Sequence, residues 1–504
     1  MAEPDAPGHA ATPARRRGWR REWLALIPAL LTFGVGLFQI QGPSFTEDED
    51  ATLLAVHRTF PELVSMLGNV DVVHGAYYSL IWAVSRLFGT SELVMRFPSA
   101  VAMAVAAGGV VLLGQRLVST DAGLAAGLVF AVLPSVSWFA EDARDYAVVT
   151  ALAVAATYIL VRAMDATARR RRWLIAYGVA LAALGLANLF ALLIIAAHAI
   201  TLASRARSDP GSAPRIGRGF VAGWLAAVVA AVIAVSPVAV AGQAQNRQIN
   251  WIGPLTLRDV RSVERVAGSQ PLFWAVVVIV LITVISGALI SREWRHTRWP
   301  RPLVSLALPW LVLPPALLLL ISVFDPVYTY RYIACCIPAL ALLAGTALVA
   351  LGRVIAVIGL IVIMLIGLPQ QISQRAQDGH GFDIRRVDRI VARDQRPGDA
   401  VLNLAAWDYE RAFEIGYPYG LRRLPDVSRG QTAVRSVTIG GTFAPVPVQR
   451  QRLANVTRLW AVGGDTKDVP MLNGLDFTLV HRWYISGGIW LRLYSHPSQG
   501  AGQQ

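Results

Sequence analysis

The sequence has few of the residues on which small secreted domains and metal-binding modules depend. It contains only two cysteines, Cys335 and Cys336. They are adjacent within an apolar run, too close together for a normal disulfide bridge, and no CxxC spacing occurs. The sequence therefore predicts neither a disulfide framework nor a structural zinc site.

Charge is also scarce. Charged residues make up 15% of the 504 residues, 55% are apolar, and the mean hydropathy is +0.49. This composition excludes an ordinary soluble enzyme and predicts a protein that crosses a membrane several times. The net charge of +14 comes from short arginine clusters between apolar runs, where the positive-inside bias places them. Because no basic stripe with interleaved aromatics is present, nucleic-acid binding is not expected.

The apolar runs predict an α-helical polytopic membrane protein with about eleven transmembrane helices. The runs are Trp23–Ile40, Phe97–Gly114, Ala122–Ala140, Tyr146–Met164, Trp173–Ala187, Leu189–Ala203, Phe220–Val240, Leu272–Ile290, Leu303–Phe324, Ile333–Leu351 and Val354–Leu368. A further segment, His74–Phe88, is shorter, carries Arg86 and is rich in Tyr and Trp, which is typical of a helix lying at the membrane interface.

The distribution of the basic clusters supports placing His74–Phe88 outside the membrane. With it outside, the basic clusters all fall on the cytoplasmic side. They are Arg15–Arg21, Arg116, Arg169–Arg172, Arg205–Arg218, Arg292–Arg301 and Arg353. If this segment crossed, several of these clusters would move outside, against the bias.

The chain is expected to have three parts. Residues 1–22 form a basic cytoplasmic tail, and the apolar run that follows lacks a small-residue cleavage site, which indicates an uncleaved first span. Residues 23–369 form the transmembrane domain, with an outer loop, 41–96, that carries interfacial helices. Residues 370–504 read as an extracytoplasmic α/β domain. Its expected strands are Asp399–Ala405, Val456–Gly463 and Phe477–Ile485, and its expected helices are Asp383–Arg393 and Asp408–Ile415.

Four polar clusters lie at the predicted outer face: four acids at Glu47–Asp50, His74 with Tyr77 and Tyr78, the turn EDARDYA at Glu141–Ala147, and DPVYTYRY at Asp325–Tyr332. Each has an ordinary explanation: a solvated acidic loop, an interfacial histidine, a soluble turn, or an arginine that reaches toward head groups. Together they place carboxylates, a histidine and arginines on one face of a membrane. That set suits a carboxylate base and cations that hold a leaving phosphate.

These motifs resemble those of the C-type membrane glycosyltransferases, in the branch of bacterial protein O-mannosyltransferase-like enzymes and the lipid A aminoarabinose transferase. The residues that carry the resemblance are Asp48, Glu49, His74, Tyr77, Tyr78, Asp142, Arg144, Tyr146, Ala147, Arg331, Tyr332 and Pro338, and it covers roughly Trp19 to Pro369.

The resemblance implies a transferase that uses a polyprenyl-phosphate sugar at the outer face of a bacterial plasma membrane. Asp48 would be the catalytic base with Glu49 beside it, and Arg331 would bind the donor phosphate. The substrate-binding residues would be His74, Tyr77, Tyr78, Asp142, Arg144, Tyr146 and Tyr332. No cofactor is required and no metal ligands are predicted. A divalent cation is compatible with the resemblance, but Asn188 stands where relatives often place a Thr-His pair.

The favoured function is an inverting hexosyltransferase of cell-envelope glycan or glycoconjugate synthesis, with mannose as the favoured sugar on family analogy. The acceptor is a hydroxyl of a glycan, a glycolipid or a protein. An arabinofuranosyl or other pentosyl transferase is an alternative. A lipid-linked-sugar flippase is another, but the predicted spans carry almost no charge, unlike a transporter with polar residues at mid-membrane. A non-catalytic envelope scaffold is a more distant third.

Overall fold

The computed structural model describes residues 19–166, 168–207, 216–289, 300–404, 413–417, 419–465 and 469–496. Most of the predicted N-terminal tail and of the cluster Arg292–Arg301 lie outside this part of the chain. So do much of Arg205–Arg218 and most of the predicted helix Asp408–Ile415.

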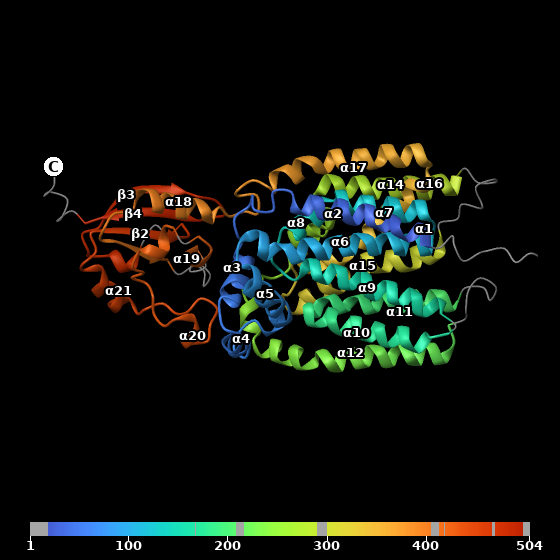
Figure 1. Ribbon diagram of the computed structural model, residues 1–504, viewed down its shortest axis with the longest axis horizontal. Coiled ribbons are helices and arrows are strands. Elements are labelled where there is room, and N and C mark those ends of the chain that lie inside the picture. Colours follow the sequence, from blue (N-terminus) through green and yellow to red (C-terminus); the bar gives the residue numbers. More distant parts are fainter. Residues whose placement is uncertain are drawn as a thin grey trace, which may run out of the picture.

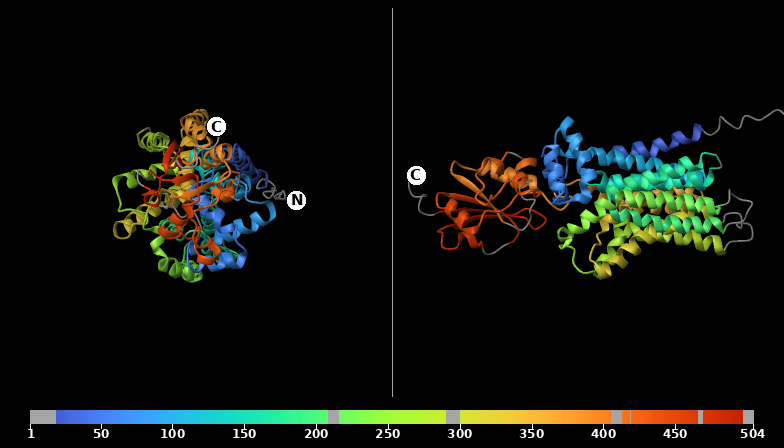
Figure 2. Two further views of the ribbon diagram at one scale, coloured as in Figure 1. Left: turned by 90° about the vertical axis from the view of Figure 1, so that its left-hand side faces the viewer. Right: turned by 90° about the horizontal axis from the view of Figure 1, so that it is seen from below.

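Long helices form a bundle at one end of the molecule, and a small sheet lies at the other end (Figure 1; Figure 2). The bundle contains α1 (Trp19–Glu22), η1 (Trp23–Ala25), α2 (Leu26–Leu37), α6 (Glu92–Leu117), α7 (Thr120–Val132), α8 (Pro134–Ala140), α9 (Tyr146–Asp165), α10 (Arg170–Ala187), η3 (Leu189–Leu193), α11 (Ile194–Ala206), α12 (Arg218–Ala244), α14 (Gln270–Leu289), α15 (Arg301–Phe324), η7 (Tyr330–Cys336), α16 (Ile337–Ala350) and α17 (Arg353–Ser373).

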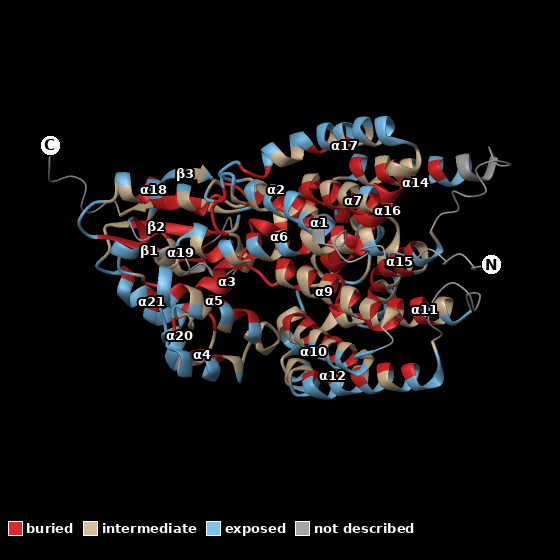
Figure 3. Cartoon of the chain, turned by 45° about the vertical axis from the view of Figure 1, so that its right-hand side comes forward, coloured by how far each residue is buried: buried red, intermediate tan, exposed pale blue. Residues whose placement is uncertain are grey.

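The bundle is that of a multi-pass membrane protein. Among the described residues, seven helices are long and apolar enough to cross a membrane, or up to nine if each of two bent pairs counts as one span. In the span Tyr330–Ala350, 89% of an 18-residue apolar window is buried, so this span lies at the centre. The corresponding share is 11% in Arg218–Ala244 and in Arg353–Ser373, which lie at the periphery. Figure 3 shows this gradient, with exposed residues along α12 and α17. The predicted count of about eleven stays a prediction.

One predicted span is broken. The run Ala122–Ala140 forms α7 and α8, which meet at an angle of 63°. Leu133 has an extended backbone (φ −68°, ψ 127°) because Pro134 follows it, and a residue before proline avoids the helical region. The bend leaves α8 leading into the polar turn 141–145. α7 also packs very closely on α6, since a Cβ added to Gly114 would lie 2.5 Å from the Cα of Gly123.

Short helices cover the end of the bundle that faces the sheet (Figure 1). They are α3 (Glu47–Val56), α4 (Phe60–Leu67), η2 (Val72–His74), α5 (Gly75–Phe88), η4 (Asn246–Ile249), α13 (Leu257–Arg261) and η5 (Ser262–Ala267). The predicted interfacial helix His74–Phe88 corresponds to α5 and is not among the candidate spans. Its amphipathic sequence packs Tyr78 and Ile81 inward and leaves Leu87 exposed.

The C-terminal sheet has the strand order β1-β2-β4-β3. β1 (Asp399–Asn403) pairs in parallel with β2 (Arg458–Gly463), while β4 (Trp490–Ser495) pairs antiparallel with β2 and with β3 (Thr478–Tyr484). The helices of this region are α18 (Ile384–Asp394), α19 (Phe413–Gly416), η9 (Leu421–Arg423), α20 (Ala433–Ser436), α21 (Val446–Leu453) and η10 (Pro470–Leu472). Three strands and α18 match the predicted segments closely, and β4 was not predicted.

The sheet and the outer-loop helices share one hydrophobic core, named here the shared core. It includes Leu53 and Tyr78 from the outer loop and Val387 and Trp460 from the C-terminal region. Polar contacts flank it: the Tyr417 hydroxyl donates a hydrogen bond to Glu92 at 2.7 Å and accepts one from the backbone N–H of Phe45 at 3.0 Å. The C-terminal region is therefore packed against the end of the bundle that carries α3 and α5.

Candidate active site

Polar side chains from four distant segments meet at the end of the bundle that faces the C-terminal sheet. These segments are the first turn of α3, the η2–α5 junction, the turn 141–145 between α8 and α9, and η7 at the start of the central span. Residues 283 positions apart in the chain, Asp48 and Arg331, form an ion pair there. The fold thus brings together the four clusters that the sequence analysis singled out.

The acidic run forms the start of a helix. Thr46 caps α3 in a capping box, in which its hydroxyl accepts a hydrogen bond from the backbone N–H of Glu49 and the Glu49 carboxylate accepts one from the N–H of Thr46. Carboxylates in the first turn also interact favourably with the helix dipole. Successive helical residues point about 100° apart, so the four acids face different surroundings.

Asp48 points into the site. One carboxylate oxygen contacts the Arg331 guanidinium, and the other lies 3.7 Å from Nη2 of Arg144. The side chain is 25% exposed, so the carboxylate stays within reach of a second molecule. An aspartate held by two guanidinium groups and partly open to solvent can accept a proton once one of these partners is taken by another anion.

Glu49 is turned away from the site and is fully buried. Arg96 of α6 donates two hydrogen bonds of 2.7 Å to its carboxylate, and the backbone N–H of Ala143 donates a third at 2.9 Å. The remaining Arg96 donors bind the carbonyls of Ile40, Pro43 and Ser44. These contacts favour a positioning role for Glu49, which joins α3 to the turn 141–145, over the catalytic role predicted for it.

Arg144 is the centre of a hydrogen-bonded chain. It donates to the Tyr78 hydroxyl at 3.0 Å, and Tyr78 donates to the Asp71 carboxylate at 2.7 Å. Its Nη2 lies 3.2 Å from Nε2 of His74. The turn that carries Arg144 is therefore linked to both η2 and α5.

The contact with Arg144 fixes the protonation of His74. Arginine has no acceptor, so Nε2 of His74 accepts the hydrogen bond and the ring proton sits on Nδ1, which lies 3.9 Å from Asp145. Burial, together with the charge of Arg144, holds the pKa of His74 well below its usual range. His74 is therefore neutral and acts as a hydrogen-bonding residue.

The other predicted residues line or support the same region. Tyr77 is buried in the shared core, and Tyr146 begins α9 with its ring 5.5 Å from that of Phe139. The backbone carbonyl of Asp142 accepts a hydrogen bond from Ser99 at 2.7 Å, and its Oδ1 is buried without a hydrogen-bond partner in the described structure. Tyr332 stacks on Phe190, with ring centroids 5.2 Å apart.

Sequence reasoning missed several members of the site. Arg96 lies near the start of α6, where a single charge beside an apolar run gives a weak signal. Asp71 and Asp145 belong to polar segments of the sequence but were not assigned a role. Glu47 was grouped with the acidic run but was not assigned a role. Burial raises its pKa to about 7, although the charge of Arg331 lowers it in part, so its protonation changes near neutral pH.

The two site arginines have hydrogen-bonding capacity to spare. Nε of Arg144 and Nε of Arg331 are buried and have no hydrogen-bond partner in the part of the chain that the structure describes. Beside Arg331, the ring of Trp251 lies 5.9 Å from its guanidinium and lines a cavity of about 480 Å³. Arg258 and Arg265 line the same cavity. The site is thus suited to an anion with several oxygens. Among the described residues, no three His, Cys, Asp or Glu side chains gather to hold a metal ion.

An apolar helical bundle with an acid–arginine site at one end is typical of an integral-membrane protein, and comparison with known proteins shows what the chain is similar to. The family model described as dolichyl-phosphate-mannose-protein mannosyltransferase matches residues 76–241. No curated relative matches the chain significantly.

Three solved structures are similar in fold. ArnT from Cupriavidus metallidurans in the apo state is 16% identical with a TM-score of 0.59, covering 94% of this chain and 98% of that one. The same protein bound to undecaprenyl phosphate is 16% identical with a TM-score of 0.59, and the match covers 97% of this chain and 100% of that one. Arabinofuranosyltransferase AftD from Mycobacteria is 15% identical with a TM-score of 0.50, and the match covers 94% of this chain and 40% of that one. The chain therefore has an ArnT-like fold, and the resemblance to the C-type glycosyltransferase superfamily, in its protein mannosyltransferase and ArnT-like branch, is confirmed.

Proposed function

We propose that the chain is a membrane glycosyltransferase that moves a sugar from a polyprenyl-phosphate-linked donor to an acceptor hydroxyl. It acts at the outer face of a bacterial plasma membrane, in the synthesis of a cell-envelope glycan or glycoconjugate. The acceptor is a glycan, a glycolipid or a protein. Residues 370–504 form an extracytoplasmic domain, and the site lies on the same side of the membrane.

One observation carries the proposal: Asp48 and Arg331 neutralise each other in the structure, while Arg331 and Arg144 each keep a buried, unused N–H donor. A donor phosphate that binds Arg331 would compete with Asp48 for the guanidinium. The carboxylate would then be released toward the acceptor. The site thus couples donor binding to the availability of the base.

The reaction follows from this exchange. The acceptor oxygen attacks the anomeric carbon from the face opposite the phosphate, and Asp48 takes the hydroxyl proton. The bond between the anomeric carbon and the phosphate oxygen breaks, and the negative charge of the departing polyprenyl phosphate is stabilised by Arg331. A phosphate needs no proton from an acid to leave, so one carboxylate suffices. The configuration at the anomeric carbon is inverted.

Two sugar classes have support. The description of the matching family model favours mannose, and hence a hexosyl transfer. The similar fold of AftD, whose name states that it transfers arabinofuranose, supports a pentosyl donor as the alternative. No residue of the site distinguishes the two hydroxyl patterns, so the donor is assigned by direct assay.

The test uses purified protein in liposomes with radiolabelled polyprenyl-phosphomannose, polyprenyl-phosphoarabinose and a mixed acceptor pool. We expect label transfer from one of the donors and a loss on the order of 10²–10⁴-fold in Asp48→Asn. The matched control is Asp121→Asn, which breaks another Asp–Arg pair, Asp121 with Arg353 at 2.9 Å, on the α7 and α17 helices. Full activity of Asp48→Asn, or movement of the labelled lipid across the bilayer without transfer, would overturn the proposal.

A further inference from the structure

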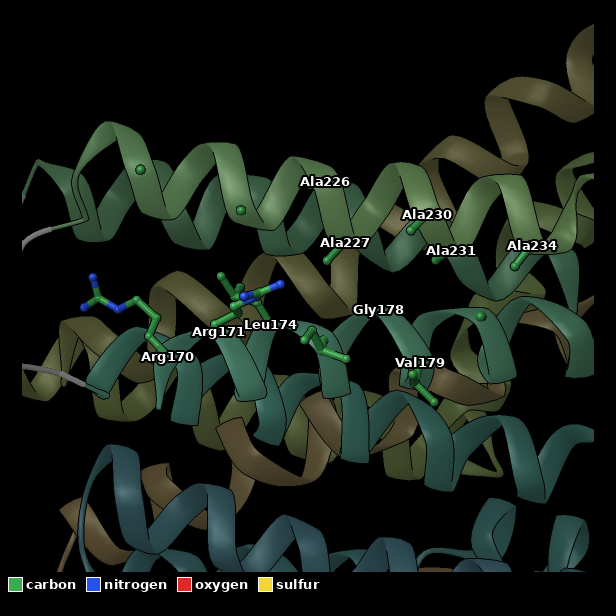
Figure 4. A pocket seen from close by; sticks show the side chains of 14 residues that line it. Arg170, Arg171, Leu174, Gly178, Val179, Ala226, Ala227, Ala230, Ala231 and Ala234 are labelled. Carbon is green, nitrogen blue, oxygen red and sulfur yellow. The ribbon is translucent and has the colours of Figure 1, made fainter. Parts of the chain in front are cut away.

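A groove of about 670 Å³ runs between α10 and α12. It lies among the membrane helices, away from the acid–arginine site, and Figure 4 shows it from close by. Two arginines, Arg170 and Arg171, stand at one end. Its other lining residues are small or aliphatic: Leu174, Ile175, Gly178, Val179, Ala182, Gly219, Gly223, Ala226, Ala227, Ala230, Ala231 and Ala234.

Small residues allow α10 and α12 to approach each other closely at the bottom of the groove. A Cβ added to Gly178 would lie 3.2 Å from the carbonyl oxygen of Ala227, so the two helices nearly touch at that level. Above this contact, alanines of α12 replace the large side chains that would fill the space. Ala226, Ala230 and Ala234 are exposed and follow one another at every fourth residue, on one side of the helix. The resulting groove is apolar and follows α12 from Gly219 to Ala234, a helix length of about 22 Å.

The arginines at the mouth are available for a ligand. The Nε of Arg170 donates to the carbonyl of Ala166 at 2.9 Å, and its guanidinium lies 5.2 Å from the ring of Phe220 on α12. Arg171 is exposed. Arg116 and Arg205 share the carboxylate of Asp165. By contrast, neither Arg170 nor Arg171 pairs with a carboxylate within the described ranges of the chain.

We propose that the groove is a binding site for one anionic glycerophospholipid. The head-group phosphate binds between Arg170 and Arg171, and one acyl chain lies along the alanines of α12. The charge of the mouth and the apolar channel behind it complement the two ends of such a lipid, and basic sites between membrane helices recognise anionic head groups. The head group belongs to the leaflet opposite the acid–arginine site, because Arg170 begins α10 at the end where α9 finishes, whereas the site lies at the start of α9.

The lipid has a defined mechanical role. α12 is only 11% buried along its span, so it has little protein around it other than α10. At its outer end, the Gln245 side chain accepts a hydrogen bond from the backbone N–H of Val72 at 3.0 Å and donates one to the carbonyl of Leu67 at 3.0 Å. A lipid wedged between α10 and α12 holds α12 in place and thereby supports the η2 segment that carries His74.

The test measures binding and stability and does not depend on enzymatic activity. Delipidated protein in detergent is titrated with phosphatidylglycerol or with phosphatidylcholine of the same acyl chains. Native mass spectrometry reports the number of bound lipids, and thermal unfolding reports the stabilisation. Because a ligand that binds only the folded state raises its stability, we expect one retained phosphatidylglycerol and a Tm rise of a few degrees. Phosphatidylcholine is expected to give neither.

Two matched pairs of variants locate the site. Arg171→Gln should remove the effect, whereas Arg172→Gln, also exposed but outside the groove, should keep it. Ala230→Leu fills the channel and should remove retention, whereas Ala222→Leu, an exposed α12 position outside the lining, should not. Equal binding of phosphatidylcholine, loss of binding in both control variants, or no retained lipid would overturn the proposal. Displacement of phosphatidylglycerol by polyprenyl phosphate at equal concentration would also overturn it, because the groove would then be a donor-lipid site.

Discussion

Arg96 of α6 and Glu49 of α3 are joined by two hydrogen bonds of 2.7 Å in the fully buried interior. The pair also binds the backbone of the turn 141–145 through the N–H of Ala143. One ionic contact therefore joins α3, α6 and the turn 141–145. Because Asp48 is the neighbour of Glu49 on α3, this contact also fixes the position of Asp48. We therefore expect Glu49 to position the first turn of α3 and Asp48 to carry out the proposed chemistry.

This division predicts opposite phenotypes for neighbouring substitutions. Glu49→Gln leaves the buried guanidinium of Arg96 without its charge partner and should lower the free energy of unfolding by about 3–5 kcal/mol. Asp48→Asn, which alters a partly exposed pair, should leave the stability nearly unchanged while activity is lost. Thermal unfolding of both variants in detergent checks this. If Glu49→Gln keeps the wild-type Tm but loses activity, Glu49 is catalytic instead.

Arg331 should control the use of the lipid donor. Arg331→Ala removes the cation that we propose receives the departing phosphate, so we expect a higher KM for the donor together with a lower kcat. Arg331→Lys keeps the charge but loses the planar, multidentate donor set and should recover only part of the activity. Steady-state kinetics with the donor varied at saturating acceptor provide the measurement. A donor KM equal to that of the wild type in Arg331→Ala would move the phosphate site elsewhere.

Glu47 should make donor binding depend on pH. Its pKa is raised to about 7 in the folded protein by burial, so Glu47 is neutral below this pH and ionised above it. The ionised carboxylate beside Arg331 opposes a bound phosphate, so the donor KM should rise as the pH increases through about 7. Glu47→Gln stays neutral and should give a flatter profile. Glu62→Gln, in the first turn of α4, is the control and should follow the wild type.

Glu141 should make stability fall as the pH rises. Arg375 lies 3.0 Å from its carboxylate, yet burial is the larger effect and raises its pKa from 4.5 to about 8. The folded state therefore binds a proton that the unfolded chain has already lost. This contribution to stability is complete below pH 4.5 and is lost as the pH rises to about 8.

The measurement is the Tm of detergent-solubilised protein across this range. Glu141→Gln should reduce the slope, whereas Glu264→Gln should not change it. A Tm that rises with pH in the wild type but not in Glu141→Gln would contradict the assignment.

Tyr417 should anchor the C-terminal region to the outer loop. Tyr417→Phe removes the hydroxyl that donates to Glu92 and accepts from Phe45, at a cost of about 1–3 kcal/mol because buried groups lose their partner. Tyr419→Phe is the matched control, since Tyr419 is 67% exposed. Limited proteolysis of the C-terminal region reports the local effect. Equal cleavage rates in the two variants would show that the hydroxyl contributes nothing to docking.

The sequence predicted the parts of the site that depend on local pattern. Charges beside apolar runs stood out, and Asp48, Arg144 and Arg331 indeed lie together. The role of Glu49 could not be predicted, because a step of one residue along a helix turns the side chain by about 100°. Asp48 therefore faces the site, and its neighbour Glu49 faces the interior. Its partner Arg96 is 47 positions away, and such a pairing becomes visible only once α3 and α6 are packed. The strand β4 was missed although Gly487 and Gly488 lie between β3 and β4, where a Gly-Gly pair is typical of a hairpin turn.

The shared core also bears on how such proteins can diversify. Because Leu53 and Tyr78 of the outer loop pack in the same cluster as Val387 and Trp460, the C-terminal region is not a detachable module. A chimera that exchanges it for the corresponding part of a relative would place mismatched surfaces against α3 and α5. We therefore expect that the outer loop and the C-terminal region must be transplanted together to keep the shared core packed.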